Sequence, residues 1–372
     1  MPLKIVSGLD FYTNGRKNES FYVSLQTDSL TLAVMPKNVT LKDIAAEAGV
    51  SIALVSFVMN NRSEADGKQK YRVNENTRQR ILEVARKLKY QPNSAARTLR
   101  KGHSLVIGAI LSDISNIFYG EIARHLEKIA FEHGYTVLFG SSDEIPEKFD
   151  KLVKSFLDKG VEGFIVVPCQ GSEKTLWHIN SIGVPVVIID RIDIDFPAPK
   201  VVLDNVQAMN NAVSLLTRKG ISNIHLISYE MRISSMIGRE EGFMRSMSSL
   251  GYDNPENRIH RVPFADVESA IDKLLPKLFK SDVEGLVCAN NALAIATIRK
   301  LSSMGVKIQE DIHLVGFDNS DVYGLFYPPI PHVGQPIETI CVEAFNFLRK
   351  LMNKEISQSS KVVTLEGVIL NA

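Results

Sequence analysis

The sequence predicts a small all-α head followed by a two-lobed α/β core, and two observations support this fold class. Between residues 40 and 90, apolar residues recur at helical spacing around a glycine turn. From Ser104 onward, near-continuous apolar runs alternate with amphipathic ones. This alternation is typical of parallel strands covered by helices on both faces. A chain of 372 residues has room for two or three such domains.

The head begins with two short helices joined by a tight turn. The first helix carries four apolar residues on one face: Leu41, Ile44, Ala45 and Ala48. Gly49 suits the left-handed end of that helix, and Ser51 suits the cap of a second helix over 52–59. Leu54, Val55 and Val58 of the second helix can pack back on the first. The pattern indicates a helix-turn-helix, whose second helix fits the DNA major groove, although any αα-hairpin has similar spacing.

A third helical pattern begins at Asn74, and two specific motifs frame this region. Thr-x-x-Asp-Ile-Ala-x-x-Ala-Gly-Val-Ser starts at Thr40, and Tyr-x-Pro-Asn-x-x-Ala-Arg-x-Leu starts at Tyr90. Together they resemble the lactose-repressor (LacI/GalR) family of bacterial transcription regulators. The resemblance runs from about Lys37 to the C-terminus. It implies a helix-turn-helix domain at 37–92, a hinge helix at 93–102 and a periplasmic-binding-protein-like effector core of doubly wound parallel sheets at 103–372.

The resemblance also implies which residues of the head contact DNA. Ile52, Ala53 and Phe57 occupy the base-reading positions. The phosphate-contact positions are Thr40, Ser51, Ser56, Asn60 and Thr77. Phe57 stands where the family usually has Arg, which can grip guanine with two hydrogen bonds. We therefore expect an atypical operator, read through apolar contacts with thymine methyl groups.

Two segments connect the head to its surroundings. The hinge is too short to be helical alone, so we expect it to fold only when two copies pair on DNA. The resemblance makes Leu99 a wedge in the minor groove, with Ala96 and Arg100 beside it, although Leu99 could instead pack on the core. The loop 61–72 is longer than the family's connection and carries four cationic residues. It either reaches flanking phosphates or is a solvated loop.

Charge separates the head from the rest of the chain. Residues 37–102 hold 14 Lys and Arg against 6 Asp and Glu, which leaves 29 against 36 elsewhere. A basic head on an acidic body favours salt-dependent binding to nucleic acid by the head.

Composition also bears on compartment and on the N-terminus. Cys169, Cys288 and Cys341 are too widely spaced for a disulfide framework or a metal site, and no apolar run approaches the roughly 20 residues of a membrane span. These features favour a cytoplasmic protein with no membrane partner. Residues 1–36 fit no element of the fold. They are either a disordered leader or the product of an upstream start, with Met35 as the natural first residue.

Eight apolar runs predict the strands of the core: 105–111, 136–140, 163–167, 184–189, 200–202, 225–228, 285–289 and 314–316. No Gly-x-Gly-x-x-Gly follows the first run, and no Walker loop, Ser/His/Asp set or paired-carboxylate motif is present. The sequence therefore predicts a non-enzyme without cofactor or metal. We assign lobe 1 to about 103–198 and 331–357, and lobe 2 to about 199–330 and 358–372.

Polar side chains follow several of these strands, at the edge where doubly wound sheets bind their ligands. Carboxylates, amides and a guanidinium around an aromatic face suit a sugar, whose hydroxyls need both donors and acceptors. The resemblance assigns the effector site to Phe118, Asp190, Arg239, Phe264, Asn290, Asp318 and Gln335. Asn291 stands where the family usually has Asp.

These features predict a DNA-binding transcription regulator, namely a repressor of carbohydrate-utilisation genes that acts as a homodimer on a palindromic operator. The expected effector is a sugar, with a nucleoside or another small polar metabolite as the second choice. A non-enzymatic sugar-binding protein with a degenerate head is the alternative. Whether the effector releases or promotes DNA binding depends on which lobe arrangement it prefers.

Overall fold

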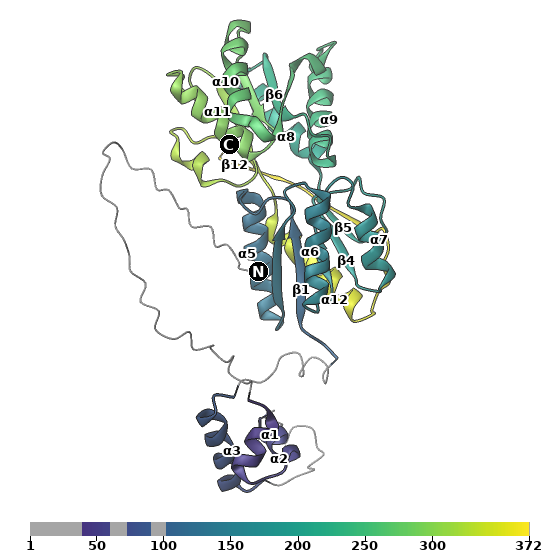
Figure 1. Cartoon of the computed structure of the whole chain (residues 1–372). Helices are drawn as coiled ribbons and strands as arrows, with labels where there is room; N and C mark the ends of the chain where they lie inside the picture. Colours follow the sequence, from purple (N-terminus) through teal and green to yellow (C-terminus); the bar gives the residue numbers. More distant parts are fainter. Residues whose placement is uncertain (1–38, 60–72, 91–101, 372) are drawn as a thin grey trace, which may run out of the picture. The chain divides into compact units, whose positions relative to one another are not determined.

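The computed structural model of the chain describes residues 39–59, 73–90 and 102–371 (Figure 1). These residues fall into two compact units, one within residues 1–92 and one within 93–372. The predictions for residues 1–36, Asn60, the loop 61–72, and the hinge residues Ala96, Leu99 and Arg100 lie outside the described residues.

The head is built from three helices: α1 (Leu41–Ala48), α2 (Ile52–Met59) and α3 (Glu75–Lys87). Thr40 and Asp43 form a capping box at the start of α1, and Gly49 ends that helix with φ of 62°. Ile44, Val55 and Ile81, one from each helix, are completely buried against one another. The three apolar faces expected from the sequence therefore meet in one small core.

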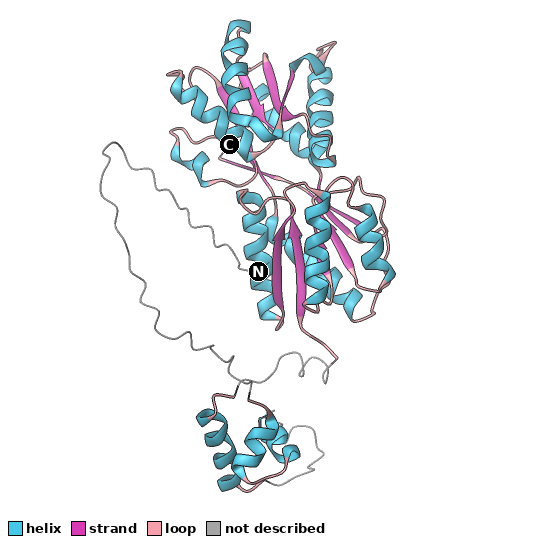
Figure 2. Ribbon diagram, viewed as in Figure 1, coloured by secondary structure: helices cyan, strands magenta, loops and turns pink. Residues whose placement is uncertain are grey.

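Within the described residues, lobe 1 is a six-stranded parallel sheet in the order β11-β5-β4-β3-β1-β2. Its strands are β1 (Val106–Leu111), β2 (Thr136–Ser141), β3 (Phe164–Val166), β4 (Val186–Ile189), β5 (Lys200–Leu203) and β11 (Val362–Leu365). Its helices are α5 (Ile117–Glu132), α6 (Pro146–Asp158), α7 (Glu173–Ser181) and α12 (Ile337–Met352). The apolar residues of α5 and α12 pack on one face of the sheet, and those of α6 and α7 on the other. Figure 2 shows the helices of the lobe arranged around its strands.

The described part of lobe 2 repeats this plan with the sheet order β12-β10-β9-β8-β6-β7. Its strands are β6 (Ile224–Tyr229), β7 (Ile259–Val262), β8 (Gly285–Cys288), β9 (His313–Phe317), β10 (His332–Gly334) and β12 (Val368–Leu370). Its helices are α8 (Asn205–Arg218), α9 (Ser234–Ser249), α10 (Val267–Leu278) and α11 (Asn291–Ser303). The sheet is parallel except for β12, which runs antiparallel to β10.

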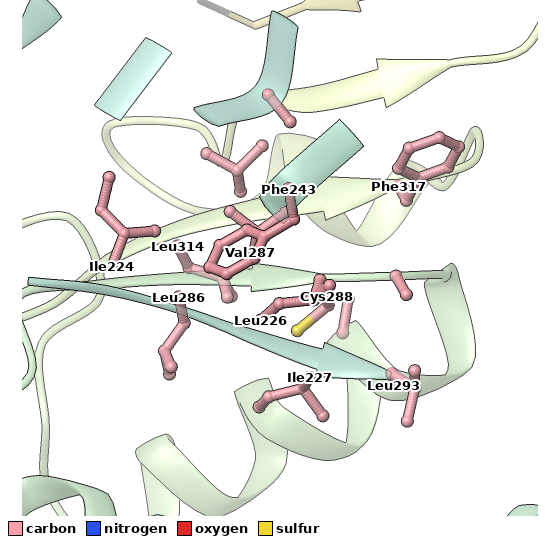
Figure 3. Packing of buried hydrophobic residues seen from close by; sticks show 14 of the residues in the cluster. Ile224, Leu226, Ile227, Phe243, Leu286, Val287, Cys288, Leu293, Leu314 and Phe317 are labelled. Atoms are coloured by element: carbon pink, nitrogen blue, oxygen red, sulfur yellow. The ribbon is translucent and has the colours of Figure 1, made fainter. Parts of the chain in front are cut away.

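The side chains of lobe 2 alternate between the two faces of its sheet, as a strand period of two requires. Figure 3 shows Phe243 of α9 beside Val287 on one face, and Leu293 of α11 on the side of Ile227. All four residues are completely buried. Helices on both faces therefore explain why these strands read as continuous apolar runs.

The observed sheets divide the chain differently from the predicted lobe boundaries. The strands β5 and β11 were assigned to lobe 2 but pair in the sheet of lobe 1, whereas β10 was assigned to lobe 1 but pairs with β9 in lobe 2. The boundaries were wrong at these strands because the hydrogen-bonding partner of a strand, and not its own sequence, decides its sheet. The C-terminal tail forms two strands, β11 in the sheet of lobe 1 and β12 in the sheet of lobe 2.

Candidate functional site

A cavity lies between the lobes, at the carboxyl ends of their strands. Its empty volume is about 540 Å³, a figure that includes open solvent at the mouth. All seven residues predicted for effector binding line it: Phe118, Asp190, Arg239, Phe264, Asn290, Asp318 and Gln335. The structure brings these residues together from both lobes, and their role in binding stays a prediction.

On the lobe 1 side, Arg191 is held by two carboxylates. Its Nη2 donates to Glu144 Oε1 at 2.6 Å, and its Nε donates to Asp190 Oδ2 at 3.2 Å. The Tyr119 hydroxyl also donates to Asp190, at 3.0 Å. Burial lowers the pKa of Arg191, but the Tyr119 oxygen and both carboxylates outweigh burial and raise it above its ordinary value. Arg191 is therefore a permanent cation inside a closed ion-pair network.

On the lobe 2 side, Arg239 is held mainly by neutral groups. Its Nε donates to Asn205 Oδ1 at 2.8 Å, and its Nη1 donates to the carbonyl of Ala289. The guanidinium lies 3.8 Å from the centre of the Phe317 ring. The nearest carboxylate oxygen, on Asp318, is 4.0 Å from Nη2. Burial lowers the pKa of Arg239, with Asp318 acting in the opposite direction.

The position of Arg239 depends on the close approach of α9 to α8. A Cβ atom at Gly242 would lie 2.3 Å from the carbonyl oxygen of Val206, and one at Gly238 would lie 2.9 Å from the Cβ of Asn205. Both distances are too short for a side chain. The glycines on either side of Arg239 therefore let α9 pack against α8, which brings the guanidinium to Asn205.

Asp318 and Asn290 complete the lobe 2 wall. Asp318 accepts hydrogen bonds from Gln335 Nε2 at 2.6 Å and from the backbone N–H of Asn291 at 3.1 Å. Burial raises the pKa of Asp318, and Arg239 and Gln335 oppose that shift. Asn290 caps α11 by accepting from the N–H of Leu293 at 2.9 Å. Its amide therefore has a fixed orientation at the cavity wall.

Each lobe also contributes an aromatic pair. Phe118 and Tyr119 meet edge to face with ring centres 4.9 Å apart in lobe 1, and Tyr229 and Phe264 do so at 5.3 Å in lobe 2. Phe118 is almost fully buried, whereas Phe264 is 44% exposed. Burial raises the pKa of Tyr229 to about 12, so its hydroxyl stays protonated and can donate.

Among the described residues, hydrogen bonds join the two lobes beside the cavity. Asn291 Nδ2 donates to Asn116 Oδ1 at 3.1 Å, and the N–H of Ile192 donates to Ser234 Oγ at 3.1 Å. The Oδ1 atom of Asn291 is buried and has no partner among the described residues. Asn291, which stands where the family usually has Asp, therefore contacts the other lobe directly.

Several cavity residues were not assigned to the site from the sequence. They include Tyr119, Glu144 and Tyr229, together with Asp113, Asn116 and Arg191. Glu144 follows β2 and Tyr229 ends β6. The rule that ligand groups follow strands could have identified both. Tyr119 gave no such signal because it lies inside a helix.

The head places the predicted DNA contacts in two environments. Ile52 is 48% exposed and Ala53 is also exposed, whereas Phe57 is half-buried and packs against the head core. Thr40 and Ser51 use their hydroxyls as helix caps, toward Asp43 and the N–H of Leu54. Ser56 and Thr77 are half-buried. The base-reading and phosphate-contact roles of these residues stay predictions.

Across residues 39–59, 73–90 and 102–371, no helix is long and apolar enough to cross a membrane. In the same residues, no group of three or more His, Cys, Asp or Glu side chains is arranged to hold a metal ion.

Comparisons with known proteins cover both parts of the chain. Residues 40–93 match the family model for bacterial regulatory proteins of the lacI family, and residues 213–370 match the model for a periplasmic binding protein-like domain. The HTH-type transcriptional regulator RegA of Clostridium saccharobutylicum is 31% identical over 322 residues, covering 85% of this chain and 93% of its own. Catabolite control protein A of Priestia megaterium is 31% identical over 328 residues, covering 87% and 96%.

The fold has a close counterpart among solved structures. A lac repressor dimer bound to operator and the anti-inducer ONPF superposes with a TM-score of 0.72 at 21% identity, covering 90% of this chain and 98% of that chain. A helix-turn-helix head and a two-lobed core with a polar cavity between the lobes define a class of DNA-binding transcription regulators. The relatives above place the chain within that class: it belongs to the lacI family of bacterial regulatory proteins.

Proposed function

We propose that this regulator represses carbohydrate-utilisation genes and that a sugar controls it by binding between the lobes. The observation that carries the proposal is the chemistry of the interlobe cavity. Arg239 supplies donors, Asp190 and Asp318 supply acceptors, and Asn290 and Gln335 supply both. The aromatic pairs add apolar surface suited to the C–H face of a sugar ring.

Two structural neighbours support a carbohydrate. A transcriptional regulator CelR–cellobiose complex superposes with a TM-score of 0.62 at 22% identity. A putative ribose operon repressor from Burkholderia thailandensis superposes at 0.63 and 24% identity. A nucleoside is the second candidate, because the exposed ring of Phe264 offers a plate for stacking a planar base.

The start of the core is attached to lobe 1, which also forms one wall of the cavity. The Glu162 carboxylate accepts hydrogen bonds from the backbone N–H groups of Ser104 and Leu105, the latter at 3.1 Å. The Ser104 hydroxyl donates to the carbonyl of Gly160 at 2.6 Å. The residues that follow the hinge segment are therefore fixed to lobe 1. An effector that changes how the lobes meet would move this attachment point and alter the pairing of the hinges.

The DNA-bound form is a homodimer on a palindromic operator. The pairing of two hinge segments and a palindromic operator both require two heads related by a two-fold axis. In lobe 2, Leu325 is 81% exposed and Tyr327 is 99% exposed. These neighbouring apolar side chains are candidates for contact with a second copy.

The test is affinity selection from a random duplex library at near-physiological salt, with and without a panel of sugars and nucleosides. The expected result is a palindrome with a flexible central step, enriched or erased by one compound class. Leu99→Ala should then weaken binding to the selected palindrome more than to random DNA. Equal losses of affinity for the palindrome and for random DNA would contradict the wedge role of Leu99.

The outcomes separate the alternatives. A palindrome that responds only to nucleosides would replace the carbohydrate role. If no sequence is enriched under any condition, the head does not bind DNA sequence-specifically, and the alternative of a sugar-binding protein with a degenerate head is favoured.

A further inference from the structure

The interlobe cavity has an unequal balance of charge. Among the described residues that line it, four are carboxylates, namely Asp113, Glu144, Asp190 and Asp318, and two are guanidiniums, Arg191 and Arg239. The net charge that a ligand meets therefore depends on whether each arginine is already ion-paired with carboxylates.

Arg191 is not available to an anionic ligand. Its charge is shared by Glu144 at 2.6 Å and Asp190 at 3.2 Å. Two negative charges against one positive charge leave this network with a net charge of −1. An anion that approached it would meet repulsion before it reached the guanidinium.

Arg239 is available as a hydrogen-bond donor but is not an excess positive charge. Asp318 lies 4.0 Å away, and the Phe317 ring covers the guanidinium at 3.8 Å. Nε and Nη1 already donate to Asn205 and Ala289. The Nη2 hydrogens remain for a ligand hydroxyl, while Asp318 offsets the charge.

Asp113 adds a further negative charge at the end of β1. Its Oδ1 accepts from the N–H of Ser115 at 2.9 Å and from its hydroxyl at 2.6 Å. It forms no ion pair with a described Lys, Arg or His. A half-buried, unpaired carboxylate at the cavity wall repels an anion about 6 Å away strongly enough to weaken its binding by roughly tenfold to a hundredfold. The same oxygens accept hydrogen bonds from ligand hydroxyls at no electrostatic cost.

We infer that the effector is an uncharged polyhydroxyl compound and that the acidic lobe 1 wall rejects its phosphorylated or otherwise anionic forms. The inference rests on the proposed function, since it concerns the ligand of the same cavity. Asp113 is its main specificity-determining residue, because Glu144 and Asp190 are already shared with Arg191.

The first test works with an unidentified effector. A small-molecule extract of bacterial cells is separated at neutral pH into pools retained by an anion exchanger, retained by a cation exchanger, and retained by neither. Each pool is added to the full chain, and the melting temperature and DNA binding are measured. We expect the uncharged pool to change the melting temperature and DNA binding. Activity in the anionic or cationic pool would overturn it while leaving effector control intact. If no pool has an effect, the proposed effector control fails, and this inference fails with it.

The second test uses matched pairs: glucose and glucose 6-phosphate, ribose and ribose 5-phosphate, and cellobiose and its 6-phosphate, with glucosamine as a cationic probe. For a pair that binds, the free sugar should bind at least about tenfold more tightly than its phosphate. Asp113→Asn should reduce this preference by about tenfold. Asp158→Asn, an exposed carboxylate at the end of α6 and outside the cavity, is the control and should leave the preference unchanged. A preference for the phosphate in the unmodified chain, or an equal effect of the two variants, would contradict the inference.

Discussion

The two lobes place an aspartate at the same point of their repeated fold and pair it with arginine in different ways. Asp190 follows β4 and Asp318 follows β9, and these strands hold the same place in the two sheet orders. Both aspartates have φ of 64°, a left-handed conformation that Asp tolerates better than most residues. In both lobes this turn directs a carboxylate to the cavity.

The partners of the two aspartates differ. Arg191 is the sequence neighbour of Asp190 and is closed into ion pairs on its own lobe. Arg239 comes from α9 and approaches Asp318 only to 4.0 Å. The two equivalent aspartates therefore differ in their pairing. Asp190 belongs to an ion-pair network closed within lobe 1, whereas Asp318 and Arg239 form a looser pair at the cavity wall.

The largest effect expected from this difference is on stability. Arg191→Met removes the cation from two buried carboxylates and should lower the free energy of unfolding by about 3–5 kcal/mol. Chemical denaturation measures this loss, with the exposed Arg124→Met of α5 as the control. Adding Glu144→Gln to Arg191→Met should recover part of the loss. A loss no greater than that of the control would mean that the network is not a buried ion pair.

The next effect is on ligand binding. Arg239→Ala should weaken effector binding by about a hundredfold, because hydrogen bonds from charged donors contribute roughly 1.5–3 kcal/mol each. Operator affinity in the absence of effector should stay nearly unchanged. Titration of the active compound measures this, and Arg245→Ala is the matched control, since Arg245 lies on the same helix with its side chain 65% exposed. An unchanged effector response would remove Arg239 from the binding site.

Acid should distinguish the lobes, because lobe 2 holds a histidine pair in which His225 is buried and His260 is half-buried. His225 Nδ1 lies 2.8 Å from His260 Nε2. Burial, His260 and Arg258 lower the pKa of His225 to about 4. The unfolded chain, with a pKa near its ordinary value, therefore binds more protons between about pH 6.5 and 4, so stability is lost as the pH falls through that window.

The expected cost of this acidification is about 2–3 kcal/mol for His225. His225→Asn should flatten the stability profile between pH 6.5 and 4, as measured by denaturation at each pH. His178→Asn, an exposed histidine of lobe 1, should leave the profile unchanged. If both variants keep the full acid dependence, groups other than the histidine pair control it.

The smallest effect concerns the contact between the lobes. Asn291→Ala removes the hydrogen bond to Asn116, a net contribution of about 0.5–1.5 kcal/mol. Effector affinity should change by about twofold to tenfold, with little change in the unfolding midpoint. Ser214→Ala, a half-buried polar residue of α8 away from the lobe contact, is the control. Loss of stability without any change in affinity would make Asn291 structural only.

Much of the fold could be predicted because its signals are local. The glycine turn and caps at Gly49 and Ser51 define the helix-turn-helix, and apolar runs such as 105–111, which contains β1, define buried strands. The edge strand Ile259–Val262 was missed, because two of its four residues are polar and its alternation is too short to separate from a loop.

The cavity, too, could be predicted only in part. Strand-end position and family resemblance were enough to name seven residues that line it. They did not indicate that Arg191 is ion-paired with carboxylates while Arg239 is held mainly by neutral groups. The partners Glu144, Asn205 and Phe317 reach these arginines from other elements. Distances between such groups follow from packing and not from spacing along the chain.

The sequence by itself determined the head, the strand pattern and the polar residues at the strand ends, since helix caps and side-chain periodicity depend on near neighbours. Only the tertiary structure decided which sheet receives β5, β10 and β11, and which carboxylates neutralise which arginine. The physical reason is that strand pairing and buried charge compensation join residues far apart in the sequence. Their free energies depend on distance and burial, which exist only once the chain has folded.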